Sequence, residues 1–187
     1  TAAFFLRQKG HACTIFDSYD KLGGMMVFGI PGYRTPREVL DGEINRIIDM
    51  GVEVKLSTRV GTDVSVEELE RDFDAVFWGI GAVAGQVSSI PGGDAPNCVD
   101  GMSYLRAYNE GRLKYLDGRV LVIGAGDTAM DVLAVARRIG NVKNITLKDK
   151  PDNVILGHTV HDVATVAKRQ SGDVYVIYRR PIDKAPA

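Results

Sequence analysis

The residues with the clearest chemical potential are small residues in the run GRVLVIGAGDTAMD at positions 118–131. Gly124, Gly126 and Ala129 have the spacing G-x-G-x-x-A, directly after the apolar residues 120–123. The first glycine permits a sharp turn out of a strand, the second lets a diphosphate approach the backbone, and the alanine lets a helix pack closely on the sheet. The pattern predicts a dinucleotide-binding turn, although a glycine-rich turn that binds nothing has the same spacing.

The groups that would hold the anion are the amides of the helix that starts after this turn. The first N–H groups of a helix have no intrahelical acceptor, so they can face a phosphate. Asp127 adds a negative charge there, which is unfavourable unless its carboxylate points away or accepts backbone N–H bonds. The apolar residues expected to pack this helix on the core are Met130, Leu133, Ala134 and Ile139.

Composition sets limits on the class of protein. The chain has 187 residues and a formal net charge of −1, which gives no reason to expect nucleic acid or a membrane surface as a partner. It has no apolar run of the roughly 20 residues that a membrane span needs. Cys13 and Cys98 are far apart and form no C-x-x-C pair. We therefore expect a cytoplasmic protein with reduced thiols and no iron–sulfur cluster in these residues.

The amino-terminal residues resemble the second half of a β-α-β unit. A helix is expected over residues 1–9, ended by Gly10, and a strand over residues 11–16, followed by Asp17. An acidic residue in that place can accept hydrogen bonds from a ribose, but it can equally cap a loop. The strand and glycine turn that should precede such a helix are not in this sequence, so we expect a chain cut from a longer protein.

Further elements follow from periodicity and from glycine and proline signals. Residues 21–33 form a glycine-rich apolar loop, which either approaches a ligand or simply covers the core. A strand at 74–78 runs into a glycine turn, and its Trp78 is expected in the core. The remaining expected elements are helices at 35–50, 67–72, 102–109 and 159–169, and strands at 52–56, 144–148 and 173–178. His158 and His161, without a carboxylate or cysteine partner, make a poor metal site.

Several motifs, in order, resemble one known family over nearly the whole chain. They are KLGGMMVFGIPGYR, STRVG, DAVFWGIGA, SSIPGGD, VLVIGAGDTAMD and VYVIYRRPIDKAPA. The resemblance is to the small (beta) subunit of NADPH-dependent glutamate synthase and its FAD/NAD(P) oxidoreductase relatives, truncated here at both ends. It implies an α/β fold of the two-dinucleotide flavoprotein type, with two Rossmann-like domains and the NAD(P) domain inserted into an incomplete FAD domain.

The resemblance also implies which residues bind the cofactors. Asp17 would hold the adenosine ribose of FAD, Val60 would meet its adenine through the backbone, and Gly81 would lie beside it. The residues expected to line the flavin are Gly23, Gly24 and Met25. Those expected to cradle the NADPH diphosphate are Gly124, Gly126, Asp127 and Thr128, while Arg179 and Arg180 would neutralise the 2′-phosphate. Asp149 argues instead for NADH, because an acidic residue that far past the glycine turn favours a free ribose hydroxyl.

The domain organisation expected is a partial FAD-binding domain at residues 1–90, a linker at 91–100 and an NAD(P)-binding domain at 101–187. The function expected of the parent protein is hydride transfer from NADPH to FAD, with electrons passed on to a partner subunit or domain. The cofactors carry that chemistry, so we name no acid–base catalytic residue. Two alternatives stay open: a non-catalytic nucleotide-binding or assembly module of the same fold, and an NADH-specific relative.

Overall fold

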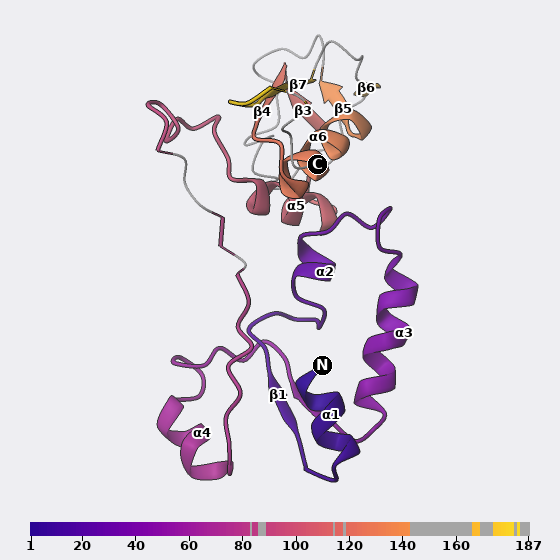
Figure 1. The fold of residues 1–187 in the computed structure, drawn as a ribbon, viewed down its shortest axis with the longest axis vertical. Helices are drawn as coiled ribbons and strands as arrows, with labels where there is room; N and C mark the ends of the chain where they lie inside the picture. Colours follow the sequence, from indigo (N-terminus) through magenta and orange to yellow (C-terminus); the bar gives the residue numbers. More distant parts are fainter. Residues whose placement is uncertain are drawn as a thin grey trace. The chain divides into compact units, whose positions relative to one another are not determined.

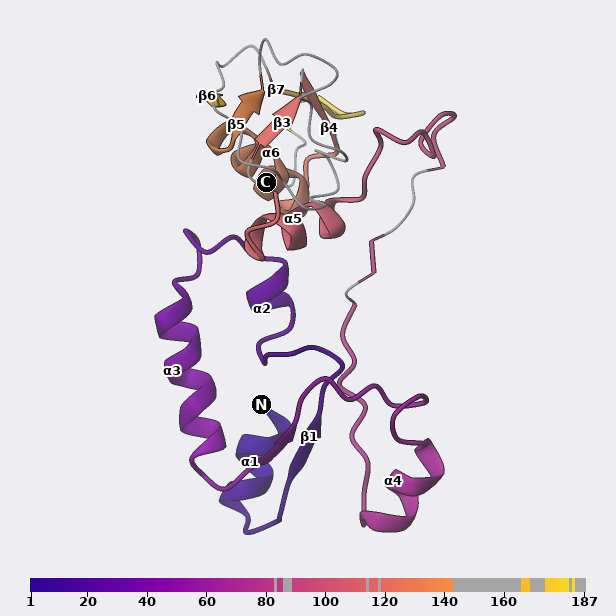
Figure 2. The ribbon, with the colours of Figure 1, turned by 180° about the vertical axis from the view of Figure 1, so that it is seen from behind.

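The computed structural model describes residues 1–82, 84–85, 89–113, 115–117, 119–142, 166–168, 174–181 and 183 (Figure 1, Figure 2). The chain divides into two compact units. Unit 1 comprises Thr1–Val27 and Thr35–Gly81, and unit 2 comprises Phe28–Arg34 and Ala82–Ala187. A short segment from the amino-terminal part of the sequence, Phe28–Arg34, therefore belongs to unit 2.

Unit 1 is a parallel strand pair with helices. Its elements are α1 (Ala2–Gln8), β1 (Thr14–Phe16), most of α2 (Met25–Phe28), α3 (Arg37–Ile48), β2 (Glu53–Lys55) and α4 (Val66–Asp72). Ile15 of β1 is in register with Val54 of β2. The helix–strand order expected from the sequence is confirmed here, and α2 is a short helix inside the stretch that we expected to be a loop.

The helices of unit 1 bury little. Neither α1 nor α3 contains a buried residue, and Phe5 and Leu6 of α1 remain 55% and 40% exposed. Polar contacts hold α1 instead, because Arg7 Nε donates to the Met50 carbonyl at 2.8 Å and Nη1 donates to the His11 carbonyl at 2.9 Å. The attachment of α1 to the rest of unit 1 therefore depends on hydrogen bonds more than on burial of Phe5 and Leu6.

The strand expected at residues 74–78 is wrong. Residues 74–82 lie in no helix or strand, and the side chains of Phe77, Trp78 and Ile80 are 75%, 53% and 79% exposed. Trp78 is consequently not a core residue. A strand needs a neighbouring strand for its backbone hydrogen bonds, and within the described residues β1 and β2 pair only with each other.

Unit 2 contains the remaining elements. They are α5 (Gly101–Asn109), β3 (Tyr115–Asp117), β4 (Val120–Ile123), α6 (Asp127–Arg138), β5 (Gly140–Val142), β6 (Val166–Lys168) and β7 (Val174–Ile177). The described strands form two sheets, with orders β3-β5-β6 and β4-β7. β4 and β7 are parallel, and β6 is antiparallel to β5. The expected strand–turn–helix at residues 118–131 and the strand after residue 173 are confirmed.

The core of unit 2 lies where α6 packs on α5, β4 and β7. The two helices lie side by side in Figures 1 and 2. The buried apolar cluster consists of Tyr104, Leu105, Ala107, Leu113, Leu116, Val122, Val135, Ala136, Ile139 and Val174. The buried residues within α6 are Asp131, Val135 and Ala136. Of the four residues expected to pack on the core, Ile139 is buried and half-buried Leu133 packs against the cluster, whereas Met130 and Ala134 are half-buried and do not belong to it.

Two expectations for the carboxy-terminal third have different outcomes. Residues 166–168 form strand β6, so this part of the helix expected at 159–169 is wrong; β-branched Val166 suits a strand that pairs with β5. The rest of that helix, the strand expected at 144–148, Asp149, His158 and His161 lie outside the described residues. Among the described residues, no helix has the length and apolar composition needed to cross a membrane.

Candidate nucleotide-binding site

The turn after β4 has the backbone that the glycine spacing predicted. Gly124 has φ +122°, a conformation that residues with a Cβ rarely adopt. Its N–H donates to the Ile177 carbonyl at 2.9 Å, which ties the turn to the end of β7. A Cβ at Gly124 would lie 3.5 Å from the Cβ of Ala129. Small residues at both positions therefore let the first turn of α6 pack closely on the end of β4.

The start of α6 is open on the side of Gly126. This residue is the N-cap, with φ −86° and ψ 173°, and no side chain caps the helix. A Cβ added at Gly126 would meet no described heavy atom within 4 Å. Asp127 and Thr128, the first residues of the helix, are both exposed. The first N–H groups of a helix have no intrahelical acceptors, so among the described residues the start of α6 has neither a capping side chain nor an atom at the position of a Gly126 Cβ.

A neighbouring helix start shows the opposite arrangement. The Asp100 side chain caps α5, because its Oδ1 accepts hydrogen bonds from the N–H groups of Met102 at 3.0 Å and Ser103 at 2.9 Å. A Cβ at Gly101 would lie only 3.0 Å from Thr128 Cγ2. The start of α5 is therefore capped by its own carboxylate and packs against Thr128, while no side chain caps the start of α6.

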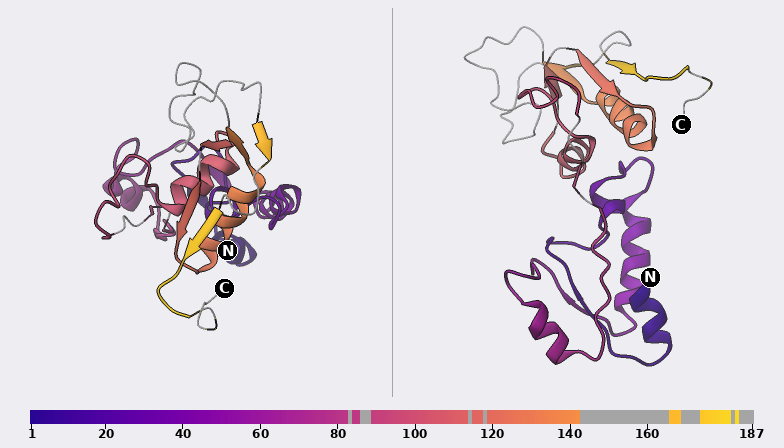
Figure 3. Two further views of the ribbon diagram at one scale, coloured as in Figure 1. Left: turned by 90° about the horizontal axis from the view of Figure 1, so that it is seen from above. Right: turned by 60° about the vertical axis from the view of Figure 1, so that its left-hand side comes forward.

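The parallel pairing of β4 and β7 brings a second group of residues to the same sheet edge. Ile123 is in register with Ile177, so the residues after β7 emerge beside the turn at Gly124 (Figure 3, where α6 is orange). Arg179 and Arg180 are two and three residues past the end of β7, and both are exposed. Two guanidinium groups thus follow the strand that borders the glycine turn. Their role and that of the turn stay predictions.

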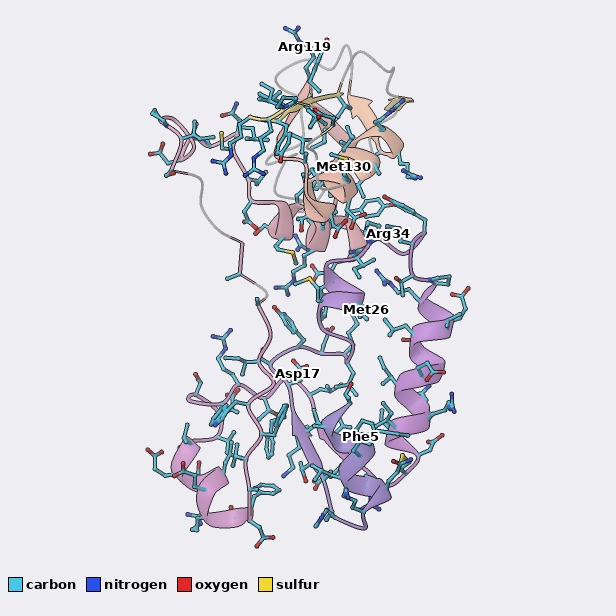
Figure 4. The ribbon with its side chains drawn as sticks, in the orientation of Figure 1. Phe5, Asp17, Met26, Arg34, Arg119 and Met130 are labelled. Carbon is cyan, nitrogen blue, oxygen red and sulfur yellow. The ribbon has the colours of Figure 1, made fainter. Side chains whose placement is uncertain are left out.

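One ion pair in unit 2 was not predicted from the sequence. Arg34 Nη1 lies 2.7 Å from Oδ1 and 2.8 Å from Oδ2 of Asp131, one helical turn beyond Asp127 (Figure 4 labels Arg34). The Asp131 side chain is 10% exposed and that of Arg34 is 48% exposed. The hydrogen bond to Asp131, together with attraction to Asp131 and Asp127, raises the pKa of Arg34 above its ordinary value. The sequence does place the Asp131 carboxylate on the same helix face as Val135. A charge buried on that face needs a partner, which was the one available signal for an ion pair.

In unit 1, Asp17 follows β1 as expected and is half-buried (Figure 4). Its N–H donates to the Lys55 carbonyl and its Oδ1 accepts the Tyr19 N–H, both at 3.0 Å. It therefore shapes the loop after β1. Oδ2 has no partner among the described residues, so a ribose could still bind there, and both interpretations made from the sequence remain.

The other predicted FAD residues lie in unit 1, most of them outside its helices and strands. Gly23, Gly24 and Gly81 have φ of +115°, +49° and +66°, so each position favours glycine for its backbone alone. Met25 begins α2 and is 36% exposed. Val60 is half-buried and forms an isolated bridge with Val64. Their contacts with FAD stay predictions.

Comparison with known sequences finds relatives that are parts of larger redox proteins. The chain is 41% identical over 143 residues to the NADP(+)-dependent formate dehydrogenase subunit beta of Moorella thermoacetica, covering 75% of this chain and 20% of that protein. It is 34% identical over 163 residues to the glutamate synthase [NADPH] small chain of Azospirillum brasilense, covering 80% and 34%. The chain thus spans a fifth to a third of these relatives.

Solved structures show the same fold. FprA of Mycobacterium tuberculosis in complex with NADPH matches with a TM-score of 0.60 and 20% sequence identity, over 70% of this chain and 32% of that one. The His57Gln mutant of FprA matches with a TM-score of 0.63 over 73% and 33%. At this identity the match establishes an α/β fold of the FprA kind and does not establish the arrangement of two domains.

The family model described as pyridine nucleotide-disulphide oxidoreductase matches residues 1–182. Its members are NAD(P)H-dependent flavoprotein oxidoreductases that bind FAD and NAD(P)H, which are the cofactors expected from the sequence. The resemblance to the glutamate synthase small subunit is likewise confirmed. On this evidence, the chain belongs to the pyridine nucleotide-disulphide oxidoreductase family.

Proposed function

We propose that unit 2 binds NADPH at the start of α6, as part of a flavoprotein that passes electrons to a partner subunit or domain. The observation that carries this proposal is the uncapped helix start at Gly126, where no atom of the described residues lies within 4 Å of the position of a Cβ. An uncapped helix start attracts a diphosphate through its N–H groups and its dipole. Gly124, Gly126, Asp127 and Thr128 would hold that diphosphate.

The choice of NADPH over NADH follows from Arg179 and Arg180. Both follow β7, which borders β4 in parallel, so they emerge at the edge where the diphosphate would lie. A guanidinium group pairs with a phosphate through two parallel hydrogen bonds, which suits the 2′-phosphate of NADPH. We therefore assign these two arginines to the recognition of that phosphate.

Unit 1 would contribute to the flavin site, and the two cofactors together supply hydride transfer from NADPH to FAD. Asp17 would accept hydrogen bonds from the ribose through its remaining oxygen, and Val60 would offer its backbone to the adenine. The glycine-rich residues Gly23, Gly24 and Gly81, together with Met25, would allow close approach of the backbone to the flavin. No side chain of this chain is assigned a proton-transfer role.

The partner proposal is supported by the names of the relatives, which are beta subunits or small chains of larger enzymes. In such an arrangement the electrons leave the flavin for a second protein or domain. We assign residues 1–90 to the FAD-binding part, 101–187 to the NAD(P)-binding part and 91–100 to a linker, with the segment Phe28–Arg34 of the first part packed in unit 2. The unpaired thiols of Cys13 and Cys98 are compatible with the cytoplasm, where we place the protein.

An anaerobic titration of the intact protein with NADPH, followed by flavin absorbance, tests this function. We expect the flavin band to bleach with NADPH, and the double variant Arg179→Ala/Arg180→Ala to need at least tenfold more NADPH while its response to NADH is unchanged. Equal bleaching by NADH and NADPH in the wild type would reject the assignment of the arginines. A folded, flavin-loaded protein that neither cofactor reduces would favour the non-catalytic module.

A further inference from the structure

Helix α6 carries two carboxylates near the end that should attract an anion. Asp127 is its first residue and Asp131 lies one turn later, about 6 Å further along the axis. The N-terminal end of a helix carries only about half a positive charge from its dipole. Two uncompensated carboxylates so close to it would outweigh that half charge and repel a diphosphate. Something must offset at least one of them.

Arg34 offers the required positive charge. Its Nη1 lies within 2.8 Å of both carboxylate oxygens of Asp131, and its attraction extends to Asp127. Asp131 is 7% exposed, so water screens its charge poorly and a charged partner has a correspondingly large effect. Arg34 is the last residue of Phe28–Arg34, the segment of unit 2 that lies far from α6 in the sequence.

The segment Phe28–Arg34 has other attachments within unit 2. Phe28 is 3% exposed, its carbonyl accepts a hydrogen bond from Asn109 Nδ2 at 3.0 Å, and the Arg106 guanidinium lies 5.4 Å from its ring centroid. The Arg138 guanidinium stacks 3.9 Å from the ring centroid of Tyr33. Removing the charge of Arg34 should therefore leave the segment in place, which separates an electrostatic role from a purely structural one.

We infer that Arg34 is a positioning residue for the pyridine nucleotide: by neutralising Asp131 it allows the start of α6 to accept a diphosphate, and it does so without touching the ligand. This inference rests on the proposed function, because it presumes that the diphosphate binds at Gly124–Thr128. It adds a specific residue, carried by a distant segment of the chain, to the determinants of nucleotide affinity.

Calorimetric titration of the intact protein with NADP⁺ tests the inference. The change Arg34→Met keeps most of the aliphatic length and removes the charge, and we expect it to weaken NADP⁺ binding about tenfold. The double variant Arg34→Met/Asp131→Asn should return the affinity to within about threefold of the wild type. Asp131→Asn alone should bind NADP⁺ at least as tightly as the wild type. This variant still tests the effect of the Asp131 charge if Arg34→Met does not fold.

The matched control is Arg138→Met. This change removes the arginine that stacks on Tyr33 of the same segment, and it leaves the ion pair of Asp131 intact. We expect its NADP⁺ affinity to stay within about twofold of the wild type. Equal losses in Arg34→Met and Arg138→Met, unaltered affinity in Arg34→Met, or a double variant that stays weak would each overturn the inference. A wild-type protein that binds no NADP⁺ would instead overturn the proposed function itself.

Discussion

The two units of this chain carry similar local patterns and bury them to different extents. Each has a parallel strand pair, and each places a predicted cofactor residue directly after a strand. Unit 2 encloses a continuous apolar cluster, whereas unit 1 buries only Val27, Val52 and Leu69 among its apolar side chains. A helix–strand pattern thus specifies local structure, whereas a core forms only where neighbouring elements cover the open faces of the strands and helices.

The largest expected effect comes from truncating one leucine to alanine in each unit, because the two leucines differ in burial. Leu105 in α5 is 2% exposed, so Leu105→Ala should destabilise unit 2 by about 2–5 kcal/mol through lost burial and a cavity. Leu6→Ala in α1, at 40% exposure, is the matched change and should cost under about 1 kcal/mol. Hydrogen exchange by mass spectrometry measures both. Equal losses of protection would contradict the contrast in burial.

Two glycine-to-alanine changes should have opposite signs. Gly124→Ala forces a Cβ onto φ +122° and should lower the stability of unit 2 by about 2 kcal/mol. Gly42 lies inside α3 with no atom near the position of a Cβ, so Gly42→Ala should raise the stability of unit 1 by about 0.5–1 kcal/mol. Urea unfolding, monitored by hydrogen exchange in each unit, measures both changes in stability. A stabilising Gly124→Ala would show that the turn is not held as described.

Helix caps give a smaller test in which the units should respond alike. Asp100→Ala in unit 2 removes the acceptor for two N–H groups of α5, and Ser65→Ala in unit 1 breaks the reciprocal bonds between Ser65 and Glu68 at the start of α4. Each should cost about 1 kcal/mol. The measurement is local hydrogen exchange in the capped helix. Ser103→Ala is the control, because it changes a side chain in the first turn of α5 and keeps both N–H groups that Asp100 caps. If Ser65→Ala lowered the protection of all of unit 1, α4 would contribute more to the stability of that unit than its burial implies.

The smallest effect is expected from acid, acting on one carboxylate of unit 2. Burial alone would raise the pKa of Glu110 in unit 2, but hydrogen bonds from Arg106 and Arg112 outweigh it and lower that pKa below its ordinary value of 4.5. A lowered folded-state pKa stabilises the protein above the unfolded value and loses that contribution as the pH falls through the folded pKa. Unit 2 should therefore weaken below about pH 4.5, and Glu110→Gln should flatten this dependence between pH 6 and pH 3. An unchanged pH profile in this variant would reject the role of Glu110.

Local signals were enough for much of the fold and for the glycine turn. The turn was predictable because strand, tight turn and helix start are all specified within residues 118–131, and the observed φ of Gly124 follows from sterics alone. The same holds for the short helices that glycine or proline delimits. By contrast, the strand expected at 74–78 depended on a partner strand that local periodicity cannot supply, and its apolar side chains are exposed.

Non-local pairing explains the remaining differences. Arg34 and Asp131 are 97 residues apart, and no periodicity connects a loop arginine with a helix carboxylate. The buried face of α6 was predicted only in part, because apolar type was used as the guide: Ile139 is buried and Leu133 packs against the core as expected, whereas Asp131 was not expected there. Asp131 takes a place on that face, since Arg34 neutralises its charge there.

NADP⁺ binding to the intact protein and to its Gly126→Ala variant tests the central claim most directly. No described atom lies within 4 Å of a Cβ at Gly126, so this methyl group obstructs only a ligand that approaches the backbone. We predict that the wild type binds NADP⁺, that Gly126→Ala binds it at least tenfold more weakly, and that the unfolding curves of the two proteins differ little. Equal affinity in the two proteins would contradict a diphosphate site at the start of α6.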